Sequence, residues 1–217
     1  MAEPPLSTAT LSDMKTRIAD ELARADLTSQ IAYAIADAID FYQSERFHFN
    51  ESRSLTFSTV ADQEFYTSSD LAAIATMQSF DYLLLYLSGL PYEINRRTPI
   101  EIELLNQGAT VTGQPYSYSY YNKQIRLGPV PDSVYTIRIA GRITYTAPAS
   151  DSEASNPWMQ DGEKLIRSRA KWELFTHVLR NAEQAEAMKA AEKEAFSQLK
   201  GKTALLSGTG QIAPMQF

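Results

Sequence analysis

Apolar residues recur at intervals of three and four in the first fifty residues, the spacing of amphipathic helices with one buried stripe. The first stripe contains Leu11, Met14, Ile18 and Leu22, and the second contains Ile31, Ile35, Ala38, Tyr42 and Phe49. Between the stripes, residues 27–30 read as a break with a fresh N-cap. The pattern therefore predicts two antiparallel helices at the start of the chain.

Between residues 54 and 146 the period changes to two, which is typical of strands with one buried and one wet face. The expected pairs are a hairpin joining 55–59 to 64–66, a second joining 80–87 to 91–94, a third joining 116–120 to 124–127, and a strand at 135–146. A short helix interrupts them, because Thr98, Pro99 and Glu101 form a capping box with proline at the first helical position. Gly108 supplies its stop.

The last third of the chain returns to helical spacing. Residues 147–156 have the small, polar, proline-containing composition of a linker that does not order itself. Apolar residues then follow a helical period from Pro157 onward, with a polar joint at Arg180-Asn181 and Gly201 as the expected helix stop. Beyond it, breakers at Gly208, Gly210 and Pro214 predict an extended tail.

These elements predict an α+β fold in which a helical body, formed by N- and C-terminal helices, carries an inserted small antiparallel β region and an extended C-terminal tail. Helices from the two ends make one core only by packing on each other. The expected divisions are an N-terminal helical pair (1–50), a β-rich insertion with one short helix (51–147), a linker (148–157), the C-terminal helices (158–200) and a docking arm (201–217).

Composition narrows the range of functions that the chain could have. A net charge of -6 argues against a general affinity for nucleic acid, and the absence of cysteine excludes disulfides and sulfur-based zinc sites and fits a reducing cytoplasm. The first residues lack the basic and apolar regions of a signal peptide, and no apolar run is long enough to cross a bilayer. We therefore expect a soluble protein with no membrane partner.

Candidate chemistry is sparse. His48 and His177 are the two histidines, and neither has the neighbours of a catalytic triad or a metal motif, so a structural role is expected for both. Glu101 with Glu103 is a possible glycosidase pair, but capping of the helix at Thr98 explains Glu101. Asp20 with Glu21 and Asp161 with Glu163 fit a wet helix face and a helix start. The sequence predicts no catalytic residue, cofactor or metal ion.

Two groups of residues suggest contacts with other proteins. The segment from Gly201 carries one charge, Lys202, and holds five large apolar residues that a broken chain cannot bury by itself: Leu205, Leu206, Ile212, Met215 and Phe217. An arm that orders on a neighbour is the favoured interpretation, and a frayed terminus is the alternative. The cations Arg167, Arg169 and Lys171 could face DNA, but the acidic residues near them favour a solvated or subunit-contact face.

The order of several motifs along the chain resembles one known family. These motifs are FYQSERFHFN (41–50), FSTV (57–60) with QEFY (63–66), RRTP (96–99), GATVTGQP (108–115), IRLGPVP (125–131), LIRSRA (165–170) and the C-terminal 208–217. Together they resemble the head-to-tail adaptor proteins that sit below the portal of tailed phages.

This resemblance implies a non-enzymatic virion protein of the neck, assembled in the host cytoplasm. It implies a homo-oligomeric ring of about a dozen copies, a portal protein above, and a tail, nozzle or stopper protein below. DNA would pass through the lumen without specific binding. The alternatives are a virion-associated peptidoglycan hydrolase and a stand-alone protein-binding module.

Overall fold

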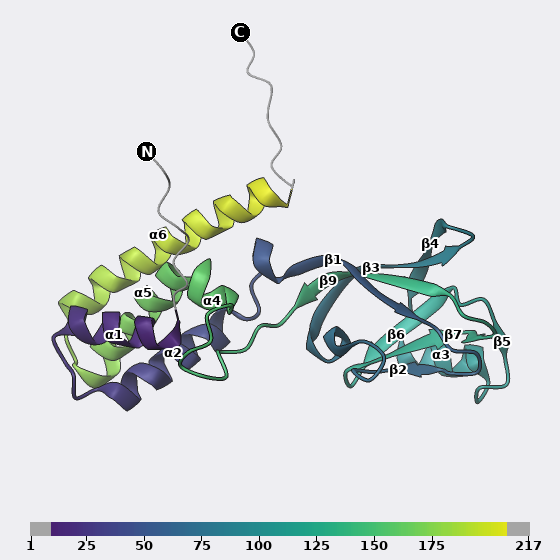
Figure 1. Cartoon of the computed structure of the whole chain (residues 1–217), viewed down its shortest axis with the longest axis horizontal. Helices are drawn as coiled ribbons and strands as arrows, with labels where there is room; N and C mark the ends of the chain where they lie inside the picture. Colours follow the sequence, from purple (N-terminus) through teal and green to yellow (C-terminus); the bar gives the residue numbers. More distant parts are fainter. Residues whose placement is uncertain (1–9, 208–217) are drawn as a thin grey trace, which may run out of the picture. The chain divides into compact units, whose positions relative to one another are not determined.

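The computed structural model describes residues 10–207 and divides the chain into two compact units (Figure 1). Of the described residues, 10–49 and 145–207 form the helical unit, and Asn50–Thr144 form the sheet unit. All the described strands lie in the sheet unit and most of the described helices lie in the helical unit, so the predicted α+β class is confirmed.

The helical unit contains segments from both ends of the chain. Its elements are α1 (Leu11–Leu22), α2 (Thr28–Tyr42), α4 (Pro157–Gln160), α5 (Glu163–Glu173), the π-helix η3 (Leu174–Val178) and α6 (Ala182–Leu206), and the 3₁₀ helix η1 (His48–Asn50) follows α2. Helix α5 packs against both α2 and α6. The core joins apolar residues of both chain segments, among them Met14, Ile35, Phe47, Trp158 and Ile166.

Local sequence explains several helix ends. The Thr10 hydroxyl accepts a hydrogen bond from the Asp13 N–H, and the Asp13 carboxylate accepts one from the Thr10 N–H, so α1 starts with a capping box. The predicted joint before α6 is also present, because Arg180 has φ 50° and the Asn181 side chain caps α6. By contrast, the expected cap of α2 is missing: Leu27 precedes that helix and makes no side-chain capping bond.

Two helical expectations are wrong. Phe49 lies in η1 and not in α2, where it packs on Phe47 and Trp158. Helix α6 continues through Gly201 to Leu206, so residues 201–206 are helical and not an extended arm. Tertiary contacts hold this last turn and a half, since the His48 N–H donates to the Thr203 hydroxyl and Lys202 pairs with Asp161.

The segment 147–156 is ordered against the helical unit. The Ser12 N–H donates to the Asp151 carbonyl, and the Lys15 ammonium pairs with the Asp151 carboxylate at 2.6 Å. The Asn156 side chain donates to the Thr146 carbonyl and accepts from the Trp158 N–H to cap α4. Segment 147–156 has few apolar residues to bury, and hydrogen bonds to the helical unit order it instead. The expectation of an unordered linker is therefore wrong.

The sheet unit is larger than expected and mixed. Its elements are β1 (Glu51–Ser58), β2 (Phe65–Tyr66), η2 (Ala72–Thr76), β3 (Met77–Leu87), β4 (Leu90–Arg96), α3 (Pro99–Asn106), β5 (Thr112–Gly113), β6 (Ser117–Tyr121), β7 (Gln124–Gly128), β8 (Val130–Pro131) and β9 (Thr136–Ile143). Seven strands form one sheet in the order β1-β9-β3-β4-β6-β7-β2, in which β4 and β6 are parallel. Strands β5 and β8 form a separate parallel pair. The prediction of a small, purely antiparallel region is therefore wrong, because the main sheet has seven strands and one parallel contact.

Two of the three predicted hairpins are confirmed. Strands β3 and β4 pair across Ser88-Gly89, whose positive φ angles of 51° and 82° suit a tight hairpin turn, and β6 pairs with β7 across Asn122-Lys123. The hairpin expected at 55–66 is wrong, because β1 pairs with β9 and β2 with β7. Side-chain bonds of Thr59 to the 133–135 loop direct the chain away from such a reversal.

None of the helices within residues 10–207 combines the length and apolar character that crossing a membrane requires.

Candidate docking surfaces

The C-terminal end of α6 exposes two leucines. Thr203 is buried, whereas Leu205 is 81% and Leu206 62% exposed. Helical geometry places these neighbours at different angles around the axis, so they cannot both face the body. The other three arm residues predicted from sequence, Ile212, Met215 and Phe217, lie outside the described residues. Of the five apolar arm residues predicted from sequence, the structure therefore describes Leu205 and Leu206, and both are exposed.

The three cations predicted as subunit contacts have partners within the chain. Arg167 and Lys171 on α5 both bind the Glu21 carboxylate of α1, and Lys171 does so at 2.6 Å. All three side chains are at most 19% exposed. Burial tends to raise the pKa of Glu21, but the hydrogen bond from Lys171 and the two cations outweigh it and leave that pKa below its ordinary value. In the folded chain these cations fasten α5 to its neighbours.

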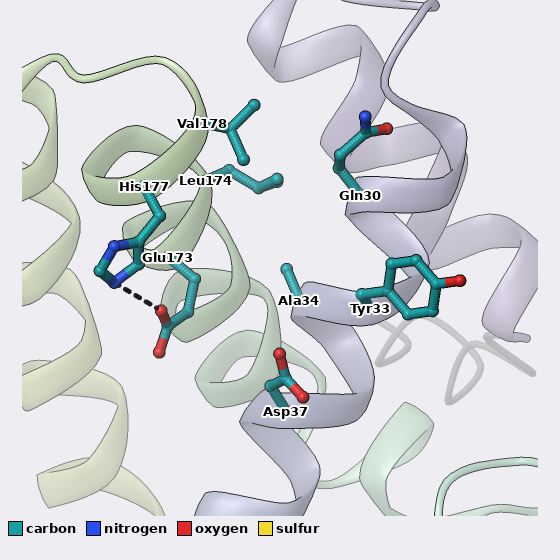
Figure 2. Close-up of a pocket in the computed structure, with 8 residues that line it drawn as sticks. All are labelled: Gln30, Tyr33, Ala34, Asp37, Glu173, Leu174, His177 and Val178. Carbon is teal, nitrogen blue, oxygen red and sulfur yellow. Dashed lines mark ion pairs between the residues drawn. The ribbon is translucent and has the colours of Figure 1, made fainter.

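A cavity of about 370 Å³ lies between α2 and the α5–η3 helix. Its lining residues are Gln30, Tyr33, Ala34, Asp37, Glu173, Leu174, His177 and Val178. Figure 2 shows the apolar side chains of Leu174 and Val178 between the two helices, and the His177 ring turned toward Glu173. The His177 Nε2 atom lies 3.3 Å from the Glu173 carboxylate. His177 thus borders a cavity, and its ring contacts Glu173 and the Trp172 ring on the same helical segment.

A second cavity, of about 400 Å³, lies at the C-terminal end of α2. Its lining residues are Phe41, Tyr42, Glu45, Arg169, Lys189, Glu192, Lys193 and Phe196. Because α2 contributes to both cavities and the Arg169–Glu173 ion pair of 2.9 Å joins their linings, we treat them as one surface, the α2 face.

The α2 face rests on a buried polar network. The Tyr42 hydroxyl donates to the Glu192 carboxylate at 2.5 Å, and the Arg169 guanidinium lies 3.3 Å from the same carboxylate. That guanidinium also lies over the Phe41 and Trp172 rings, with its Cζ atom 4.0 Å and 4.3 Å from the two ring centroids. Burial, and then the hydrogen bond to Glu192, raise the pKa of Tyr42, so its hydroxyl stays protonated as a donor.

Sequence reasoning missed this network. Tyr42 and Glu192 are separated by 150 positions, so no local motif connects them. The available signal was Glu192 itself, a carboxylate on the side of α6 that also carries the apolar residues Ala185 and Leu199. A buried carboxylate needs a partner.

The candidate catalytic carboxylates have structural partners. Glu101 accepts the Thr98 N–H at 2.8 Å, and this backbone bond, followed by the Thr98 hydroxyl, lowers the pKa of Glu101. Glu103 pairs with Arg126, which also pairs with Glu64 at 2.6 Å. The capping box predicted at Thr98 is confirmed. Both carboxylates thus make structural contacts within the sheet unit.

The remaining acidic candidates and His48 also contact nearby residues. Asp161 lies 3.5 Å from His48 Nε2, and Glu163 pairs with Arg17 and Arg167 at 3.1 Å. Over residues 10–207, no group of three histidine, aspartate or glutamate side chains has an arrangement that would hold a metal ion.

Exposed leucines at a helix end and an aromatic, cavity-bearing helix face are features of proteins that assemble with other proteins. The sequence matches the SU10 adaptor protein family over residues 9–213, and the chain belongs to this family of phage head-to-tail adaptors. The resemblance noted from its motifs is thereby confirmed. Comparison with curated proteins gave no match.

Proposed function

We propose that this protein acts as a structural subunit of the virion neck, forming a ring under the portal and joining it to a tail, nozzle or stopper protein. Membership of the adaptor family supports the phage structural role. In this proposal about a dozen copies assemble with cyclic symmetry. DNA passes through the lumen without specific binding, which accords with a net charge of -6 per chain.

The observation that carries the portal-docking part is the exposure of Leu205 and Leu206 at the end of α6. Covering a large apolar side chain contributes roughly 1.5 to 3 kcal/mol, and ordering the chain around it opposes that gain at about 1 to 2 kcal/mol per residue. Because Leu205 and Leu206 already lie in a helix, their backbone is ordered before docking. The contact made by one copy remains weak, but many copies in one ring bind the portal together, so the whole ring attaches firmly.

The test uses the full chain with Leu205→Ala and Leu206→Ala together. We expect portal attachment, measured by co-sedimentation with purified portal, to fall at least about tenfold per ring, because many weakened contacts act together. The thermal melting temperature should stay within about 2 °C of the parent, because neither side chain belongs to the core.

Ile100→Ala with Leu104→Ala provides the matched control. These residues also project from a helix, α3, and are 62% and 69% exposed, so the pair removes comparable apolar surface. Unchanged portal attachment of the Leu205/Leu206 variant, or equal loss in the control, would show that the end of α6 is not the docking element.

A further inference from the structure

The α2 face presents exposed aromatic residues that no described contact of the helical unit covers fully. Tyr33 is 70% and Phe41 55% exposed, and together with Asp37 they follow at intervals of four along α2. Residues with this spacing are neighbours along one side of a helix. Exposed aromatic side chains beside cavities are typical of surfaces that bind another protein.

Two carboxylates of this face have partners within the chain: Glu45 pairs with Lys200, and Glu173 pairs with Arg169. Further charges lie at its two borders. Asp37 and Asp40 are exposed on α2, and Lys189 and Lys193 are exposed on α6. Within residues 10–207 the structure records no ion pair for Asp37, Asp40 or Lys193, while Lys189 has only a pair of 4.0 Å with Glu186. Phe41 and Phe196 line the cavity beside these lysines. The face thus has an acidic border, an aromatic centre and a basic border.

We propose that a second copy of this chain docks on the α2 face about a two-fold axis. A two-fold contact uses the same patch on both copies, so the patch must complement itself. Rotation about an axis through the aromatic centre brings Asp37 and Asp40 of one copy opposite Lys189 and Lys193 of the other. The same rotation brings the two Phe41 rings together. A patch of one sign would repel its own copy, and this patch does not have one sign.

The remaining charge of the chain does not prevent this contact. Each copy carries -6, but repulsion between distant surface charges is screened beyond about 8 Å at physiological salt, whereas groups in contact interact directly. Exposed ion pairs are individually weak, so we expect a reversible dimer. The contact concerns the free protein and is independent of the proposed docking on the portal.

Charge reversal tests the proposal by sedimentation equilibrium of the full chain. Asp37→Lys with Asp40→Lys makes both borders basic, and Lys189→Asp with Lys193→Asp makes both acidic. Each variant alone should dimerise at least about tenfold more weakly than the parent, because like charges then face each other. An equimolar mixture of the two should dimerise again, because every basic border then meets an acidic one.

Asp20→Lys with Glu93→Lys is the charge-matched control, since both residues are exposed and lie outside the α2 face. It changes the net charge as the first variant does and should leave dimerisation unchanged. The proposal is overturned by a parent that stays monomeric at millimolar concentration, by reversed variants that dimerise normally, by a mixture that stays monomeric, or by assemblies larger than a dimer.

Discussion

At the scale of single residues, Glu192 shows how one side chain connects three helices. It lies on α6, accepts the Tyr42 hydroxyl of α2 and contacts the Arg169 guanidinium of α5. A carboxylate that is 7% exposed is strongly disfavoured unless such partners compensate for its lost hydration. This requirement fixes the relative position of the three helices at the C-terminal end of α2.

Gly141 on β9 is the residue for which the structure makes the sharpest stability prediction. A Cβ atom there would lie 2.1 Å from the Ser79 carbonyl oxygen, which belongs to the backbone of β3 and cannot move aside without breaking the pairing of the strands. Gly141→Ala should therefore lower the free energy of unfolding by about 3 kcal/mol, measured by chemical denaturation.

Gly113→Ala is the appropriate comparison. Its Cβ would meet the Pro129 side chain at 3.9 Å, an ordinary contact, so its free energy of unfolding should change far less. A Gly141→Ala protein as stable as the Gly113→Ala protein would contradict the close approach of β3 and β9.

At the scale of elements, α6 illustrates how tertiary contacts override a local signal. Gly201 predicts a helix end, yet the helix continues to Leu206, because Lys202 binds Asp161 and Thr203 binds His48. Glycine in a helix interior costs conformational entropy, but its backbone can adopt the helical conformation. The contacts of the next two residues are sufficient to offset that cost.

Gly201→Ala follows as a stabilising substitution. A Cβ at this position meets no atom within 4 Å, and the backbone is helical. We expect the free energy of unfolding to rise by about 0.5 to 1 kcal/mol, chiefly because the unfolded chain loses freedom. The measurement is a urea titration of parent and variant. A destabilised variant would mean that the helix ends at residue 201 in solution.

At the scale of the whole molecule, residues 10–207 contain two separate hydrophobic cores. One joins apolar residues of the helices, and the other joins residues of the strands, including Phe57, Leu83, Ile125 and Ile139. The sheet unit is one continuous segment whose ends are brought together, since Glu51 near its start pairs with Arg142 near its end. Such a segment has the properties of an independent domain.

The fragment 50–144 should therefore fold alone. We expect a β-type circular dichroism spectrum and a cooperative thermal transition, because its core and its strand pairs lie within the fragment. A fragment with a random-coil spectrum would show that the sheet unit depends on the rest of the chain. The full-length protein, measured in parallel, provides the reference for the thermal transition.

The sequence by itself determined the elements whose signals are local. Apolar spacing fixed the stripes of α1 and α2, the residues Thr98, Pro99 and Glu101 fixed the start of α3, and Ser88-Gly89 fixed the β3–β4 hairpin. Each of these depends on hydrogen bonds or side-chain contacts between residues close in the chain. The order of its motifs also pointed to the adaptor family.

Only the tertiary structure decided which distant segments meet. The pairing of β1 with β9, the parallel contact of β4 with β6 and the bond from Tyr42 to Glu192 join residues that are far apart in sequence. Every residue except proline offers the same backbone N–H and C=O groups, so the sequence of a strand carries little information about which strand it pairs with. The α2 face exists for the same reason: its acidic and basic borders belong to helices that only the folded core brings together.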